Sequence, residues 1–248
     1  MKLDAAAVLR DAWAMAKRDR DLLIAVGGVF LLVPRVAQVM FVDPTPPLPA
    51  SSSDPVALQA WLDAVALWSR HNDLFVLVLA LTLASLFGTL TLLLLYTDRD
   101  RPDVAGALRK ALPLLPRYIL LALVVTFPVN IASLLLIPGL YLKGRLMPIG
   151  PAFVAERPLG VIAAWRRSFA LTRGHGLTLM AFACVPLIAG DVLALPFELL
   201  GSAMNGAPMA NPVVAAVLDV CNGGARSVAT IAAILLEVAL YRRLRSGI

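Results

Sequence analysis

The sequence predicts an all-α protein, namely a polytopic integral membrane protein with about six transmembrane helices, three cytoplasmic interfacial amphipathic helices and internal repeats. Sixty per cent of its residues are hydrophobic and 15% are charged, whereas a soluble domain averages about 45–50% and 25%. The charged residues form short clusters, and most apolar stretches between them reach the roughly 20 residues that a helix needs to cross a bilayer. We therefore treat residues 1–248 as a single integral membrane domain.

A short pattern occurs three times, each time before a long apolar run. It reads large apolar, Arg, polar, small, large apolar, small or Pro, large apolar, within residues 8–15, 107–114 and 164–171. Such repetition favours three units, each a basic helix on the membrane followed by a hydrophobic hairpin, at about 3–96, 103–156 and 160–245. The alternative is a chance match between Ala-rich helices. The pattern residues that we single out are Arg10, Arg109, Arg166, Arg167 and Ser168.

Six apolar stretches are the candidate transmembrane helices. They lie at residues 21–42, 74–96, 118–137, 140–155, 177–200 and 212–241. The fourth is short for a span and carries Lys143 and Arg145 at one end. A five-span alternative therefore places this stretch on the membrane surface.

The placement of lysine and arginine orients the chain. With six spans both termini lie on one side, and the segments on that side hold seventeen of the 22 basic residues. Cytoplasmic loops of membrane proteins carry an excess of Lys and Arg, so we expect an inner-membrane protein with both termini in the cytoplasm. The five-span alternative would move Arg242, Arg243 and Arg245 outside and break this rule.

The same basic residues indicate a partner. The net charge of +6 comes from bases that flank the spans instead of forming one stripe, which argues against nucleic acid. We expect anionic lipid headgroups at the cytoplasmic face, which attract each basic residue near the surface by about 1 kcal/mol. Trp13, Leu112 and Phe169 of the three basic helices should then face the membrane.

A long insertion at residues 43–72 separates the first two spans and is expected in the periplasm. Its first part, 43–55, is rich in Pro and Ser and should be extended. Apolar residues then recur at helical spacing between Val56 and Trp68, with tryptophans suited to a membrane interface. We interpret this part as a surface-lying helix; a partner-binding helix is the alternative.

Residues 138–174 resemble a known family. The positions that carry the likeness are Pro138-Gly139-Leu140-Tyr141, Arg145, Pro151-Ala152, Glu156, Gly160, Ala164, Arg166-Arg167-Ser168, Leu171-Thr172 and Gly174. They resemble the membrane domain of bacterial glycerophosphoryl diester phosphodiesterases and of related stand-alone inner-membrane proteins. In the two-part members a soluble barrel carries the catalysis. The resemblance thus implies the membrane part without the enzyme part, and it transfers no catalytic residue.

The residues themselves favour no enzymatic chemistry. The two histidines, His71 and His175, fall on opposite predicted sides of the membrane, and no Gly-x-Ser-x-Gly elbow or phosphate-binding glycine loop is present. Cys184 and Cys221 lie within predicted spans, where a free thiol behaves as a small apolar residue. We therefore expect no enzyme, no cofactor and no metal site.

Polar residues inside the predicted spans are the most informative positions. A charge facing lipid at mid-bilayer costs about 2.5–3.5 kcal/mol, so such residues should face the interior and pair. Glu237 is one such charge, and we expect Asp191 to pair with Arg226 across a hairpin of the last two spans. One interpretation of these residues is a polar path for a charged ligand. The alternative is a set of ion pairs that fixes the register of the helices. The candidate network comprises Arg35, Asn130, Lys143, Arg145, Asp191, Glu198, Asp219 and Arg226.

Two functions from different classes follow. The first is a non-catalytic inner-membrane protein that binds, organises or moves a lipid or small amphiphile through a polar bundle interior. The alternative is a structural or assembly protein that recruits partners through its surface helices and periplasmic loop. A polar cavity that opens towards lipid favours the first, and a close-packed interior favours the second.

Overall fold

The computed structural model describes residues 4–42, 46, 49, 54–71, 75–157, 159–205 and 211–246, and every element in these ranges is a helix. The all-α prediction is confirmed for the part of the chain described. In chain order the elements are α1 (Ala5–Arg18), α2 (Arg20–Gly27), η1 (Gly28–Leu32), α3 (Val33–Phe41), α4 (Pro55–His71), α5 (Phe75–Thr97), α6 (Val104–Ser133), α7 (Leu136–Leu146), α8 (Ile149–Ala155), α9 (Val161–Leu171), α10 (Gly176–Asn205) and α11 (Pro212–Ser246).

Five helical stretches among the described residues are long and apolar enough to cross a membrane, so the chain is a membrane protein. They are Arg20–Phe41, Phe75–Thr97, Val104–Ser133, Gly176–Met204 and Pro212–Ser246. The expected fourth span, 140–155, is not among them. Its residues divide between α7 and α8, on either side of Pro148. Proline lacks the backbone N–H that would continue the helix, and Pro148 itself departs from helical geometry with a ψ of 4°. Neither fragment alone has the length of a span.

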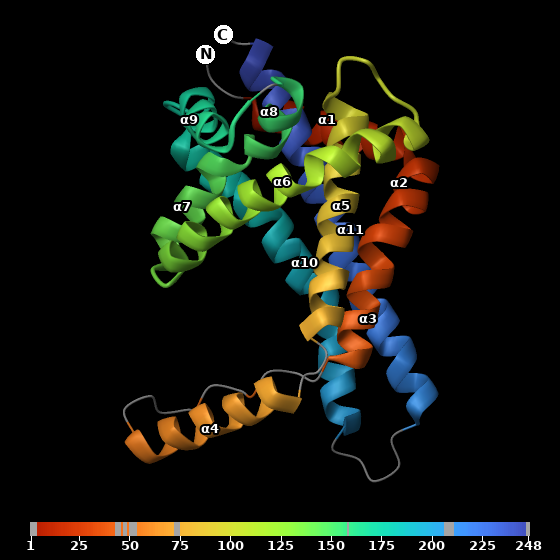
Figure 1. Cartoon of the computed structure of the whole chain (residues 1–248), viewed down its shortest axis with the longest axis vertical. Coiled ribbons are helices and arrows are strands. Elements are labelled where there is room, and N and C mark those ends of the chain that lie inside the picture. Colours follow the sequence, from red (N-terminus) through yellow and green to blue (C-terminus); the bar gives the residue numbers. More distant parts are fainter. Residues whose placement is uncertain are drawn as a thin grey trace.

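Helices α6 and α7 form a hairpin (Figure 1). The described parts nearest the two chain ends, α1 and the last turns of α11, lie at one end of the molecule, here called the terminal end (Figure 1). Both α6 and α7 connect to that end, and the turn between them lies about half-way along the long axis, short of the level where α3, α10 and α11 end (Figure 1). The turn is apolar and exposed at Leu134, Leu135 and Leu136.

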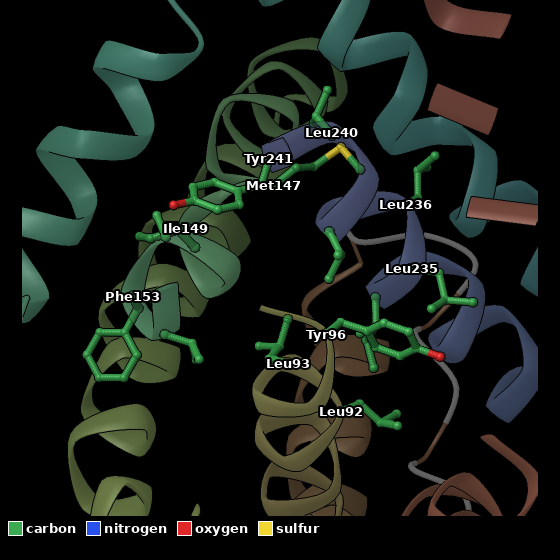
Figure 2. Close-up of a cluster of buried hydrophobic side chains, with 14 of the residues drawn as sticks. Leu92, Leu93, Tyr96, Met147, Ile149, Phe153, Leu235, Leu236, Leu240 and Tyr241 are labelled. Atoms are coloured by element: carbon green, nitrogen blue, oxygen red, sulfur yellow. The ribbon is translucent and has the colours of Figure 1, made fainter. Parts of the chain in front are cut away.

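The buried core lies at the terminal end. Figure 2 shows side chains of α5 (Leu92, Leu93) gathered with those of α11 (Leu236, Leu240) and with Phe153 of α8. All seven residues of α8 are buried, so this short helix fills the space that the ends of the longer helices leave.

Glycines allow the long helices to approach one another closely. A Cβ atom on Gly144 of α7 would lie 2.6 Å from the backbone of Leu179 in α10. A Cβ atom on Gly223 of α11 would lie 2.7 Å from a side-chain carbon of Val36 in α3. Small residues at helix crossings are the usual means of close packing in membranes. The contact of α7 with α10 therefore depends on the absence of a side chain at position 144.

The three pattern segments do not form three separate helices. The first lies in α1 and the third in α9, but residues 107–114 are the beginning of α6 and continue through Pro113 and Pro116 into its apolar half. The two prolines are about one turn apart, and the helix continues through both of them. Trp13 and Leu112 are exposed as expected, whereas Phe169 is half-buried.

Equivalent positions of the three segments have matching environments. The first residues, Val8, Ala107 and Ala164, are fully buried. The three arginines that we singled out at the third position are all exposed. The fourth residue of each segment forms an ion pair: Asp11 with Arg243, Lys110 with Asp98, and Arg167 with Glu156. The burial follows from helical periodicity alone, and the internal repeat stays a prediction.

Helix α4 lies at the end opposite the termini and projects away from the other helices (Figure 1). The helix expected from the spacing of Val56 to Trp68 is present. Trp61 Nε1 donates a hydrogen bond to the carbonyl oxygen of Pro46 at 3.1 Å. Most of the Pro/Ser-rich part of the 43–72 insertion, 43–45, 47–48 and 50–53, lies outside the described residues, as do residues 72–74.

Candidate functional site

A cavity of about 820 Å³ lies between the helices, with walls from η1, α3, α5, α6, α7, α10 and α11 and a buried end near α8. Ligand pockets in proteins typically measure about 300–1,000 Å³, so the space suits a small molecule or a lipid headgroup. Its polar lining is unusual for the interior of a membrane bundle, where charged residues generally mark a ligand path or an ion pair.

The cavity opens on the flank of the bundle. At one end its lining residues are buried, among them Leu121, Leu146 and Ile149. At the other end they are exposed; we call this opening the mouth, and its residues are Thr82, Thr126, Asn130, Asp191 and Thr230. Asp191 and Thr230 lie near the middle of α10 and α11, and Thr126 and Asn130 lie in the last part of α6, before the hairpin turn. An opening bordered by mid-helix residues leads sideways, to where lipid would surround the protein, and not to either aqueous end.

Arg226 anchors a paired cluster at the mouth. The ion pair expected from the sequence is present: Arg226 Nη1 lies 3.2 Å from Asp191 Oδ1. Arg226 Nη2 also contacts Glu198, and its Nε donates to Asn222 Oδ1 at 3.1 Å. Charge-assisted bonds of this kind are the strong ones, so the guanidinium of Arg226 is already satisfied. Asp191 is less enclosed, since 72% of its side chain is exposed.

Arg35 of α3 lines the same cavity but is poorly satisfied. Its Nε is buried and has no hydrogen-bond partner. Its Nη1 reaches Gln38 Oε1 at 3.5 Å, which is long for a hydrogen bond. A buried donor without a partner costs about 1–3 kcal/mol, and more when charged. This guanidinium therefore has donors free for water or for a ligand.

A second pair of charges lines the closed end, which we define by Tyr118 of α6, Lys143 of α7 and Glu237 of α11. Lys143 and Glu237 interact electrostatically. Among the described residues, however, neither forms a salt bridge within 4.0 Å or a hydrogen bond through its side chain. Glu237 lies eleven residues along α11 from Arg226, which at 1.5 Å per residue is about 16 Å. The cavity thus joins two charged regions, one paired and one unpaired.

Helix α5 contributes a stripe of hydroxyl groups. Thr82, Ser85 and Thr89 all line the cavity. Each donates its hydroxyl proton to the carbonyl oxygen four residues earlier, at 2.8, 3.0 and 2.9 Å. Because their protons are used within the helix, these oxygens face the cavity as hydrogen-bond acceptors. They suit a ligand that carries donors.

The predicted network is only partly brought together. Five of its members line the cavity: Arg35, Asn130, Lys143, Asp191 and Arg226. Glu198 joins through Arg226. Asp219 does not line the cavity and has no ion pair among the described residues.

Arg145 belongs to a different part of the molecule. Its Nε donates to Thr172 Oγ1 at 2.7 Å and its Nη2 to the carbonyl oxygen of Phe169 at 2.8 Å, and its guanidinium lies over the Phe169 ring. The arginine joins α7 to α9 at the terminal end, because it is in the last turn of α7, past the cavity. The sequence predicts that Phe169 faces the membrane, but in the structure its ring packs against the guanidinium of Arg145.

Sequence reasoning left Tyr118, Gln38 and the hydroxyl stripe out of the site, and it noted Glu237 as an intramembrane charge without giving it a place there. The stripe had a visible signal, since Thr82, Ser85 and Thr89 recur at spacings of three and four residues, one face of a helix. The proximity of Lys143 and Glu237 had none, because it depends on how α7 packs beside α11.

Charges at the terminal end are paired closely. Asp98, after α5, contacts both Lys110 Nζ at 3.0 Å and Arg157 Nη2 at 2.8 Å. Burial raises the pKa of the Asp98 carboxyl, but the hydrogen bonds from Lys110 and Arg157 outweigh it, so this pKa lies below its usual value. Glu156 receives Arg167 Nε at 2.8 Å and the Tyr241 hydroxyl at 3.0 Å.

In the described part of the chain, no three or more His, Cys, Asp or Glu side chains are placed to hold a metal ion. Cys184 and Cys221 are both free and half-buried.

Comparison with known proteins identifies no relative: no protein-family model, no curated protein and no solved structure matches the chain.

Proposed function

We propose that this is a non-catalytic inner-membrane protein that binds, organises or moves a lipid or small amphiphile in its lateral cavity. The observation that carries the proposal is a cavity of about 820 Å³, lined by charged as well as apolar residues, whose mouth lies on the flank of the bundle. Asp191, exposed at this mouth, would cost about 2.5–3.5 kcal/mol against hydrocarbon. Water in front of it removes that cost.

The surrounding topology supports access from the bilayer. We infer that α2–α3, α5, α10 and α11 cross the membrane and that the α6–α7 hairpin enters and leaves at the terminal end. Both termini then lie on one side, and the basic residues gathered at this end indicate the cytoplasm. The hairpin turn, exposed and apolar at Leu134 to Leu136, ends within the hydrocarbon beside the mouth. A lipid can therefore reach the cavity without leaving the bilayer.

The resemblance of residues 138–174 to the glycerophosphoryl diester phosphodiesterase membrane domain agrees with this proposal. In that family the catalysis belongs to a separate soluble barrel, so the resemblance supports a non-catalytic role for these residues. The alternative, a structural or assembly protein, depends on a close-packed interior, and the open cavity favours the amphiphile-binding function over it.

The test is whether lipid occupies the cavity. Thr126→Trp puts a large side chain at the mouth, and Leu123→Trp, on the same helix but outside the cavity lining, is the matched control. We expect native mass spectrometry of the purified protein to show bound lipid in the parent and the Leu123 variant, and to show its loss in the Thr126 variant. Equal lipid occupancy in all three would contradict the proposal.

Topology is tested separately by cysteine labelling in a variant with both native cysteines replaced by Ala. Ser246→Cys should react only from the cytoplasmic side. Leu135→Cys, at the hairpin turn, should resist impermeant reagents from both sides. Labelling of position 135 from the periplasm would mean that α6 and α7 cross the membrane.

A further inference from the structure

We propose that the cavity ligand is an aminophospholipid, whose zwitterionic headgroup binds at the closed end with its phosphate against Lys143 and its primary ammonium against Glu237. This inference rests on the proposed function and names the class of amphiphile.

The first argument is the charge at the closed end. Lys143 and Glu237 line one end of the cavity, on α7 and α11, and they interact without a salt bridge between them. Two arginines also line the cavity. Arg226 is already occupied by Asp191 and Glu198, and Arg35 of α3 interacts electrostatically with Arg226 and Glu198, so it belongs to that cluster and not to the closed end. The closed end thus offers one basic and one acidic side chain that form no salt bridge with each other.

The second argument is selection by repulsion. An anionic headgroup would satisfy Lys143 and leave its negative charge beside Glu237, and a cationic amphiphile would meet the reverse problem. Like charges placed close together cost several kcal/mol at a buried site and are a common source of specificity. A headgroup with one phosphate and one ammonium matches both residues at once.

The third argument separates a primary ammonium from a quaternary one. Quaternary ammonium ligands are usually recognised by several aromatic rings, and Tyr118 is the single aromatic residue lining this cavity among the described residues. A primary ammonium instead donates hydrogen bonds. The hydroxyl oxygens of the α5 stripe, Thr89 among them, are acceptors because their protons are committed to their own helix. The lining is therefore suited to the primary amine of ethanolamine and poorly suited to choline.

The fourth argument is direction. The closed end lies towards the terminal end of the bundle, and the mouth lies at mid-helix. A headgroup at Lys143 and Glu237 would send its acyl chains past Val125 and Leu187, apolar lining residues on α6 and α10, towards the mouth. The headgroup would then lie near the membrane surface at the terminal end, and the acyl chains would point towards the midplane. This is the ordinary orientation of a phospholipid in that leaflet.

The experiment measures lipid preference of the delipidated protein in detergent. Dioleoyl phosphatidylethanolamine, phosphatidylglycerol and phosphatidylcholine are titrated while thermal unfolding is followed, and soluble phosphoethanolamine tests the headgroup without chains. We expect the ethanolamine lipid to bind about tenfold more tightly than the other two lipids. Soluble phosphoethanolamine should be far weaker. Equal binding of the three lipids overturns the headgroup assignment, and equal binding of soluble phosphoethanolamine overturns the lipid assignment.

Variants test the two contacts. Glu237→Gln should remove the preference for the ethanolamine lipid and leave binding of phosphatidylglycerol unchanged or tighter, while Lys143→Gln should weaken all three lipids. Asp219→Asn is the matched control, because it neutralises a carboxylate on α11 outside the cavity, and it should keep the parent order of preference. Retention of the ethanolamine preference in Glu237→Gln overturns the proposal.

Two further measurements keep the test decisive. If Glu237→Gln or Lys143→Gln fails to fold, the preference of the parent protein still decides. The Thr126→Trp variant separates the two proposals. If it blocks lipid binding while the parent shows no headgroup preference, only the aminophospholipid inference fails. If it leaves binding of every lipid unchanged, the lipid-binding function fails as well.

Discussion

The terminal end and the middle of the bundle use the same kinds of residue in opposite ways. At the terminal end, Asp98, Glu156 and Asp11 each receive a basic side chain at 3.0 Å or less, around a core that includes the fully enclosed α8. In the middle, Arg35 has a buried nitrogen without a partner, and Lys143 and Glu237 line the cavity without a salt bridge to any described residue.

This difference separates residues that hold the fold from residues that serve a ligand. Evolution of a stable bundle removes unpaired charges, because each is costly away from water. Charges left without partners beside a cavity are therefore better explained by what enters the cavity. A charged residue in a span is then a functional candidate chiefly when its partner is missing. Because Arg226 is well paired, it indicates less about the ligand than Arg35, Lys143 and Glu237 do.

The largest expected effect contrasts packing at the two regions. Phe153 of α8 is 2% exposed at the terminal end, so Phe153→Ala should destabilise the protein by about 3–5 kcal/mol, the usual result of removing a buried aromatic ring. Val125→Ala, in the cavity wall, should cost less than about 1 kcal/mol because its side chain already borders empty space. Thermal or denaturant unfolding in one detergent measures both. Equal losses would show that the cavity wall is as closely packed as the core.

Next in size is the coupling within the Arg226 cluster. Asp191→Ala and Arg226→Ala should each lower the unfolding temperature, Arg226→Ala more, because it leaves both Asp191 and Glu198 without a cation. The double variant should recover part of the loss, with a coupling of about 0.5–3 kcal/mol. Strictly additive losses in this cycle would show that the pair contributes no stability.

A smaller effect is expected from acid titration of the terminal end. The pKa of Asp98 is lowered in the folded protein, so its ionised form contributes stability above its unfolded pKa of about 3.9, and this contribution is lost as the pH falls through the lower folded value. Unfolding temperatures measured from pH 7 to pH 3 should fall less steeply in Asp98→Asn than in the parent. An unchanged acid slope would mean that the contacts from Lys110 and Arg157 add nothing.

Hydropathy predicted most of this fold, because helix length and composition are local properties. The stretches 21–42, 74–96, 177–200 and 212–241 all lie mainly within long helices of the structure. Residues 140–155 differ because a hydropathy average does not register that Pro148 divides the helix. The Asp191–Arg226 pair was predictable because α10 and α11 are antiparallel helices joined by a short connection. Residues at the same number of positions before and after that connection lie beside each other. No such symmetry relates Lys143 to Glu237.

The α6–α7 hairpin has a consequence for how the protein is assembled. On the topology that we propose, insertion of α10 and α11 carries their connecting loop through the bilayer, whereas the hairpin, whose apolar turn would stay in the hydrocarbon, transfers no polar segment. We therefore expect the hairpin to dock sideways onto helices already in place, through the close contact of Gly144 with α10. Lys143, the residue beside that glycine, arrives with it. On this route the cavity is the last part of the molecule to form, and a lipid already beside α10 and α11 could be enclosed as the hairpin closes over it.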